Sequence, residues 1–103
     1  AKTQLTWVMQ NAGEDEARDI ARLRMAAVLL DEKNYAEAVK QLEGKPVDSM
    51  AALYADHKGD ILAAQGKKEE ARGSYQLALD RSEASSPYRD VIQLKLDALG
   101  ERK

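Results

Sequence analysis

Apolar side chains recur at helical spacing along almost the whole chain, in blocks that short polar or glycine-containing turns separate. The blocks cover residues 2–10, 15–32, 35–43, 48–65, 68–82 and 86–99. In the second block, Ile20, Leu23, Ala27 and Leu30 follow one another at intervals of three or four residues, which places them on one face of an amphipathic helix. The pattern therefore predicts an all-α chain of about six antiparallel helices.

Glycine, serine and proline mark the ends of these helices. Gly44-Lys45-Pro46 ends the third one, because glycine suits the C-terminal cap and proline cannot continue a helix. Gly66-Lys67 turns the chain between the fourth and the fifth. Ser85-Ser86-Pro87 predicts a serine cap followed by proline in the first helical turn. Each of these three boundaries thus has a residue that stops or starts a helix.

The middle of the chain repeats itself at an offset of 33 residues. Six pairs of positions agree in residue type: Ala26 with Gly59, Val28 with Ile61, Leu29 with Leu62, Glu37 with Glu70, Ala38 with Ala71, and Leu42 with Tyr75. This offset is close to the period of about 34 residues of the tetratricopeptide class, whose repeats are pairs of helices. The spacing of Gly59, Ala71, Tyr75 and Ala78 also resembles that repeat, in which small residues beside an aromatic let two helices pack closely.

We therefore expect a tetratricopeptide-repeat-like, right-handed helical solenoid. In this interpretation, residues 1–12 are the second helix of a truncated repeat, 15–44 and 48–82 are repeats, and 86–100 form a closing helix. The whole chain is then one domain, or a fragment of one, since about three such repeats are usually needed for a stable fold.

Three stretches carry a more specific resemblance, namely residues 20–30 (IARLRMAAVLL), 54–75 (YADHKGDILAAQGKKEEARGSY) and 91–100 (VIQLKLDALG). They resemble the YfgM-like family, the ancillary subunits of the bacterial Sec translocon. The positions that match the family pattern are Asp56, Lys58, Gly59, Asp60, Gly66, Ala71, Arg72 and the helical segment 93–96. The sequence departs from the pattern at Leu42, where the family often has an aromatic residue.

The resemblance implies a short cytoplasmic tail, one N-terminal transmembrane helix and a periplasmic repeat domain, with the tail and the anchor upstream of Ala1. It also implies association with the Sec translocon and with a membrane-anchored periplasmic chaperone of the prolyl-isomerase type. The expected location is the periplasmic side of the bacterial inner membrane.

Composition and charge narrow the function further. The chain has 103 residues, with 16 basic and 18 acidic side chains interspersed and a net charge of −2. No basic patch of the kind that nucleic acids or anionic membranes need is visible. The longest apolar run, residues 25–30, is far too short to span a membrane. The absence of cysteine excludes disulfides and thiolate chemistry.

Candidate chemistry gathers only around His57. Asp56, His57 and Asp60 lie within one helical turn, but neither a second histidine nor a cysteine supports a metal site there. We expect Asp56 or Asp60 to pair with Arg72 across the helix pair instead. Gly66-Lys67-Lys68 lacks the spacing and the following Ser or Thr of a phosphate loop. No catalytic constellation and no cofactor site is predicted.

The predicted function is therefore recognition of protein segments in a groove that successive first helices line. We expect its side chains to be Ile20, Leu23, Ala27 and Leu30, then Leu53, Asp56, Asp60 and Ala63, then Arg89 and Gln93. An apolar half and a charged half suit an extended or helical peptide of mixed character. The alternative is an oligomerisation module, in which another copy of the chain fills the groove.

Overall fold

The computed structural model describes residues 15–100, and every regular element within that range is helical. The α-helices are α2 (Asp15–Asp31), α3 (Tyr35–Gln41), α4 (Ala51–Ala64), α5 (Lys68–Arg81) and α6 (Tyr88–Ala98), with a 3₁₀ turn η1 (Asp48–Met50) before α4. The all-α prediction is confirmed. The helix expected at 2–10, like the whole segment 1–12, lies outside the described residues.

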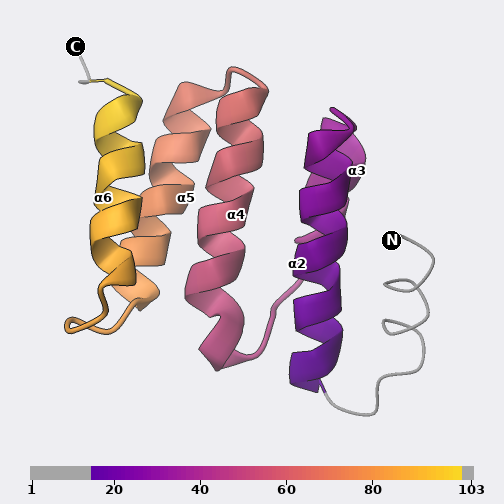
Figure 1. The fold of residues 1–103 in the computed structure, drawn as a ribbon, viewed down its shortest axis with the longest axis horizontal. Helices are drawn as coiled ribbons and strands as arrows, with labels where there is room; N and C mark the ends of the chain where they lie inside the picture. The colour runs from indigo at the N-terminus through magenta and orange to yellow at the C-terminus, as the bar shows by residue number, and fades with distance from the viewer. Residues whose placement is uncertain (1–14, 101–103) are drawn as a thin grey trace.

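The helices form two layers. In Figure 1, α2, α4 and α6 lie side by side on the near side, and α3 and α5 lie behind them, each antiparallel to the helix before it. The extents of 45 × 31 × 20 Å agree with this arrangement, because two layers of helices with side chains are about 20 Å thick. This is the helical solenoid that the repeat predicts. The observed helices fall within the expected segments 15–44, 48–82 and 86–100, although the division into repeats itself stays a prediction.

The turns inside the two helix pairs have the same hydrogen bonds at the 33-residue offset. After α2, the amides of Lys33 and Asn34 donate to the carbonyls of Leu30 (2.9 Å) and Leu29 (2.8 Å). After α4, Gly66 and Lys67 donate in the same way to Ala63 (3.0 Å) and Leu62 (2.9 Å). Both turns need one residue with positive φ, which is Lys33 (63°) in the first and Gly66 (80°) in the second.

Two apolar cores meet at α4. The first includes Leu23, Ala26 and Leu29 of α2, Ala38 of α3, and Tyr54 and Ile61 of α4. The second includes Ala55 and Leu62 of α4, Ala71, Tyr75 and Ala78 of α5, and Ile92 of α6. Since α4 contributes to both cores from different faces, it holds the two helix pairs together.

The close packing of α4 on α5 is confirmed at Gly59. An added Cβ there would lie 2.6 Å from Cε1 and 2.7 Å from Cδ1 of Tyr75, whose side chain is almost fully buried. Ala71 and Ala78 on either side of Tyr75 have no exposed surface. The small residues thus leave the space that the aromatic ring fills.

Candidate protein-interaction site

Three of the predicted groove residues come together between α2 and α4. Ala27 and Leu30 of α2 and Asp60 of α4 line a pocket of about 200 Å³. Its other lining residues are Ala26, Asp31, His57 and Ile61, and we call this site the α2–α4 pocket. The apolar residues occur at helical spacing on α2, which explains why they form one wall.

The polar side chains of the α2–α4 pocket stand at its rim. The Nδ1 atom of His57 donates to the carbonyl oxygen of Leu53 at 2.9 Å, which fixes the orientation of the imidazole. The side chain of Asp60 is 30% exposed and therefore reaches solvent. Together with Asp31, these groups offer hydrogen-bond partners around an apolar base, which is the usual composition of a site for a peptide side chain.

Asp56 does not belong to this pocket, and its assignment to the groove is wrong. It is 1% exposed and lies between α4 and α6. Its carboxylate accepts hydrogen bonds from Nζ of Lys95 at 3.0 and 3.2 Å and from the hydroxyl of Tyr88. A buried carboxylate needs such partners, because an unpaired charge in the interior is strongly destabilising.

Asp60 is shared between the pocket and the same buried cluster. It accepts hydrogen bonds from the hydroxyl of Tyr75 at 2.5 Å and from Nζ of Lys95 at 3.2 Å. We call Asp56, Asp60, Tyr75, Tyr88 and Lys95 the α4–α6 network. The expected pairing of Asp56 or Asp60 with Arg72 is wrong, since Arg72 pairs with Glu69 and donates to the carbonyl of Gly100 at 2.8 Å.

Lys95 is the member of the network that the sequence interpretation missed. It follows the fully buried Ile92 by three residues, so both side chains lie on the inward face of α6. That spacing was a usable signal that this lysine has a partner in the interior.

Burial and the two carboxylates shift the pKa values of the network. Burial, followed by hydrogen bonding to Asp60, raises the pKa of Tyr75 far above its ordinary value, and burial with Asp56 does the same for Tyr88. Burial alone would lower the pKa of Lys95, but its hydrogen bonds and charge interactions with Asp56 and Asp60 outweigh that effect and raise it. The network therefore holds its protons more tightly in the folded chain than in the unfolded one.

A second polar contact, also missed from the sequence, joins α2 to α4. The buried Asp19 accepts the amide hydrogen of Val47 at 2.8 Å through its carboxylate, and its backbone carbonyl accepts the hydroxyl of Tyr54 at 2.9 Å. Burial, followed by the negative charge of Asp19, raises the pKa of Tyr54 to about 12. These bonds fix the distance between the helices that form the α2–α4 pocket.

The other predicted groove residues lie outside the pocket. Leu23 is 7% exposed and belongs to the first core, so it has little side-chain surface to offer a partner, which corrects its assignment. Leu53 and Ala63 are half-buried against the two cores, while Ile20 is 36% exposed near the start of α2. Their part in binding stays a prediction.

The two predicted residues of α6 have local roles. Arg89 donates to the carbonyl oxygens of Leu79 (2.6 Å) and Ser82 (3.4 Å), so it caps the C-terminal end of α5 and is not free to line a groove. Gln93 is exposed and donates to Asp97 at 3.2 Å. The concave surface supported by the structure is therefore narrower than the sequence predicts.

Within residues 15–100, no group of three or more acidic or histidine side chains is placed to hold a metal ion. None of the described helices is long and apolar enough to cross a membrane.

Comparisons with known proteins agree with this architecture. The profile of the tetratricopeptide repeat-like domain family matches residues 1–101. The chain is 35% identical over 99 residues to an ancillary SecYEG translocon subunit of Neisseria gonorrhoeae, covering 96% of this chain and 47% of that protein. It is 25% identical over 99 residues to an ancillary SecYEG translocon subunit of Escherichia coli, and this match covers 96% of the chain and 48% of that protein. No solved structure gives a significant match. The resemblance to the ancillary translocon subunits is thus confirmed, and the chain spans about half the length of these curated relatives.

Proposed function

The chain belongs to the tetratricopeptide repeat-like domain family, and from this premise we propose that it is a non-catalytic scaffold that binds protein segments. The observation that carries the proposal is the α2–α4 pocket, which combines an apolar wall from Ala27 and Leu30 with the polar rim of His57 and Asp60. A peptide side chain that enters such a pocket buries apolar surface and can hydrogen bond at the rim.

The partner we propose is the Sec translocon, together with a membrane-anchored periplasmic chaperone. Support for the translocon comes from the two relatives, which are ancillary SecYEG translocon subunits. The chaperone and the location on the periplasmic side of the inner membrane rest on the family resemblance in the sequence. In this proposal, the repeat domain recruits a client or chaperone segment close to the translocation channel.

The competing function is an oligomerisation module. The observation in its favour is the outer face of α6, where Val91 and Leu94 are 44% and 68% exposed. Sedimentation of the full-length protein separates the two functions, because the competing one requires a stable dimer that the scaffold does not.

A site-specific photo-crosslinking experiment tests the scaffold. The full-length protein carries a photo-reactive amino acid at Ala27, in the pocket, or at Ala36, an exposed alanine of α3 outside it. We expect crosslinks to translocon subunits or to a periplasmic chaperone from position 27 and a much weaker signal from position 36. Ala27→Arg should abolish capture of the same proteins, whereas Ala36→Arg should not. Equal crosslinking from both positions would refute the pocket, and no crosslink to either partner from any position would refute the function.

A further inference from the structure

The side of α4 on which α3 and α5 pack is only partly covered by helices, because α3 is short. Helix α3 has 7 residues and α5 has 14, which correspond to lengths of about 10 and 21 Å. After α3, the chain crosses toward η1 as a loop that contains Gly44, with φ of +92°, and Pro46. Half of α4 on this side therefore packs against α5 but has no second helix opposite it.

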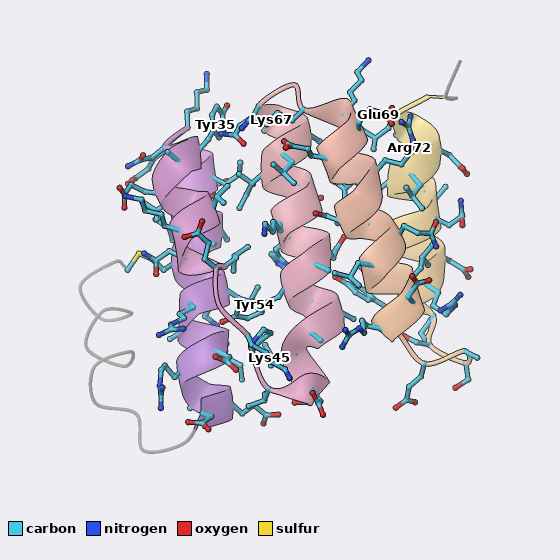
Figure 2. The ribbon with its side chains drawn as sticks, turned by 180° about the vertical axis from the view of Figure 1, so that it is seen from behind. Tyr35, Lys45, Tyr54, Lys67, Glu69 and Arg72 are labelled. Atoms are coloured by element: carbon cyan, nitrogen blue, oxygen red, sulfur yellow. The ribbon has the colours of Figure 1, made fainter. Side chains whose placement is uncertain are left out.

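A groove occupies the uncovered space. Its first part is a pocket of about 310 Å³ between the loop after α3, helix α4 and helix α5. It continues past Lys58 and Leu77, which line both parts, into an adjoining hollow of about 530 Å³ between α3 and the other half of α4 and α5. We call this surface the α3–α5 groove. Figure 2 views the molecule from this side, where Tyr54 and Lys45 lie beside one another.

The floor of the α3–α5 groove is apolar. Leu42 and Tyr54 form part of the first pocket, and Val39 and Leu62 form part of the second. Leu77 projects between them and is 47% exposed, although it lies in the middle of α5. A large aliphatic side chain at the centre of a groove gains free energy when a partner covers it.

The rim of the groove is positively charged, in contrast to the chain as a whole. Four cations line it, Lys45, Lys58, Lys67 and Arg81, against two carboxylates, Asp48 and Glu70. The groove thus has a net charge of +2, while the whole chain has −2. Among the described residues none of these four cations has an ion-pair partner, so their charges are available to a bound segment.

From this combination we propose that the α3–α5 groove is a second docking surface, which binds an acidic amphipathic segment of a partner protein. Apolar side chains of that segment would cover Leu77, and its carboxylates would pair with Lys58 and Arg81 on either side. Charge complementarity of this kind speeds association and selects against basic partners. A flat anionic membrane fits less well, because the apolar floor is recessed between the loop, α4 and α5. The surface shares no lining residue with the α2–α4 pocket, so it goes beyond the function proposed above.

The test uses two matched fluorescent peptides and the full 103-residue chain. Each peptide has about 14 residues, enough for a helix of about 21 Å, with leucine at helical spacing. All other positions are Glu in the first peptide and Lys in the second. Fluorescence anisotropy should show at least about tenfold tighter binding of the acidic peptide at low salt, and the difference should shrink as the ionic strength rises.

Charge reversal locates the site. The double variant with Lys58→Glu and Arg81→Glu should bind the acidic peptide about tenfold or more weakly than the unchanged chain does. It should bind the basic peptide more tightly. Arg24→Glu with Lys68→Glu changes the net charge equally at exposed positions outside the groove, and it should leave both affinities within about twofold. A far-UV circular dichroism spectrum and a urea transition like those of the unchanged chain show that the reversed variant is folded.

Several outcomes would overturn the proposal. Equal affinity of the chain for the two peptides would contradict it. An equal loss of affinity for the acidic peptide in the groove variant and in the control variant would also contradict it. Dimerisation that Lys58→Glu with Arg81→Glu abolishes would assign the groove to a second copy. Cosedimentation with anionic vesicles that the same variant loses would assign it to a membrane.

Discussion

At position 59, helix α4 has no side chain, and the ring of Tyr75 occupies the space where one would be. Alanine has an intrinsic helix propensity about 1 kcal/mol better than that of glycine. Gly59→Ala should nevertheless destabilise the chain by about 1–3 kcal/mol, because the new Cβ lies only 2.6 Å from the buried ring. The free energy of unfolding in urea measures the effect.

Gly73 of α5 is the matched control for this substitution. A Cβ at Gly73 meets no atom within 4 Å, and the residue is exposed. Gly73→Ala should therefore stabilise the chain by about 0.5–1 kcal/mol. If both substitutions changed stability in the same direction, the contact with Tyr75 would not control the fit of α4 on α5.

The turns at Lys33 and Gly66 make a second prediction about single residues. The two turns have equivalent hydrogen bonds, but only the second has a glycine at the position with positive φ. Lys33→Gly should stabilise the chain by about 0.5–1 kcal/mol, since a residue with a Cβ is strained in this conformation. Gly66→Lys should have the opposite effect. Thermal melting of both variants checks the pair, and equal signs would contradict the shared geometry.

The α4–α6 network holds the closing helix α6 against α4. Lys95→Met should lower the free energy of unfolding by about 3 kcal/mol, because Asp56 then keeps a buried charge without its cation. Adding Asp56→Asn removes that charge and should recover at least about 1 kcal/mol. Lys40→Met, in an exposed pair with Glu37, should cost less than about 0.5 kcal/mol. Urea denaturation of Lys95→Met, Asp56→Asn, their double variant and Lys40→Met gives the coupling energy between Lys95 and Asp56. Additive effects of the two single substitutions would show that the network is not a unit.

The network also predicts how stability depends on pH. Tyr75, Tyr88 and Lys95 have raised pKa values in the folded chain, so the native state binds more protons than the unfolded state at alkaline pH. Their stabilising effect is complete below about pH 9 and is lost as the pH rises past about 10, the ordinary range of tyrosine and lysine. The melting temperature should be constant from pH 7 to 9 and fall above 10.

Tyrosine variants separate the network from general alkaline effects. Tyr88→Phe should make the alkaline decline shallower, because one proton linked to folding is removed. Tyr35→Phe on α3, at the opposite end of the row of helices from α6 (Figure 1), should leave the slope unchanged. An unchanged slope in Tyr88→Phe would exclude this residue as a source of the decline.

Helix positions, turn residues and the contact of Gly59 with Tyr75 could be predicted because each depends on local spacing or on one repeat. The burial of Asp56 could not, since its partner Lys95 is 39 residues away in the sequence. Repeat geometry alone places a polar residue at that position in the groove. The same limit explains Arg89, whose partners are backbone carbonyls at the end of α5. The α3–α5 groove depends on the short α3 and on the path of its loop, which hydrophobic periodicity does not specify.

For the whole molecule, the shared helix α4 predicts that the two cores unfold together. Tyr54 and Ile61 of α4 lie in the first core, and Ala55 and Leu62 lie in the second. In a repeat protein each unit is stabilised mainly by its neighbours, so a loss in one core lowers the stability of the next. Ile92→Ala, in the second core, should therefore lower the free energy of unfolding by about 3 kcal/mol and should also destabilise α2.

Hydrogen exchange of the backbone amides measures this coupling. In Ile92→Ala, the protection of α2 should fall by a factor similar to that of α5 and α6, and urea denaturation should keep a single transition. Val91→Ala lies on the exposed side of the same helix. It should change the free energy of unfolding, and that of amide exchange in α2, by no more than about 0.5 kcal/mol. A loss of protection confined to α5 and α6 would show that the second core opens alone. In that case partner binding at the α2–α4 pocket would be independent of the closing helix, whereas cooperative unfolding makes α6 a determinant of both binding surfaces.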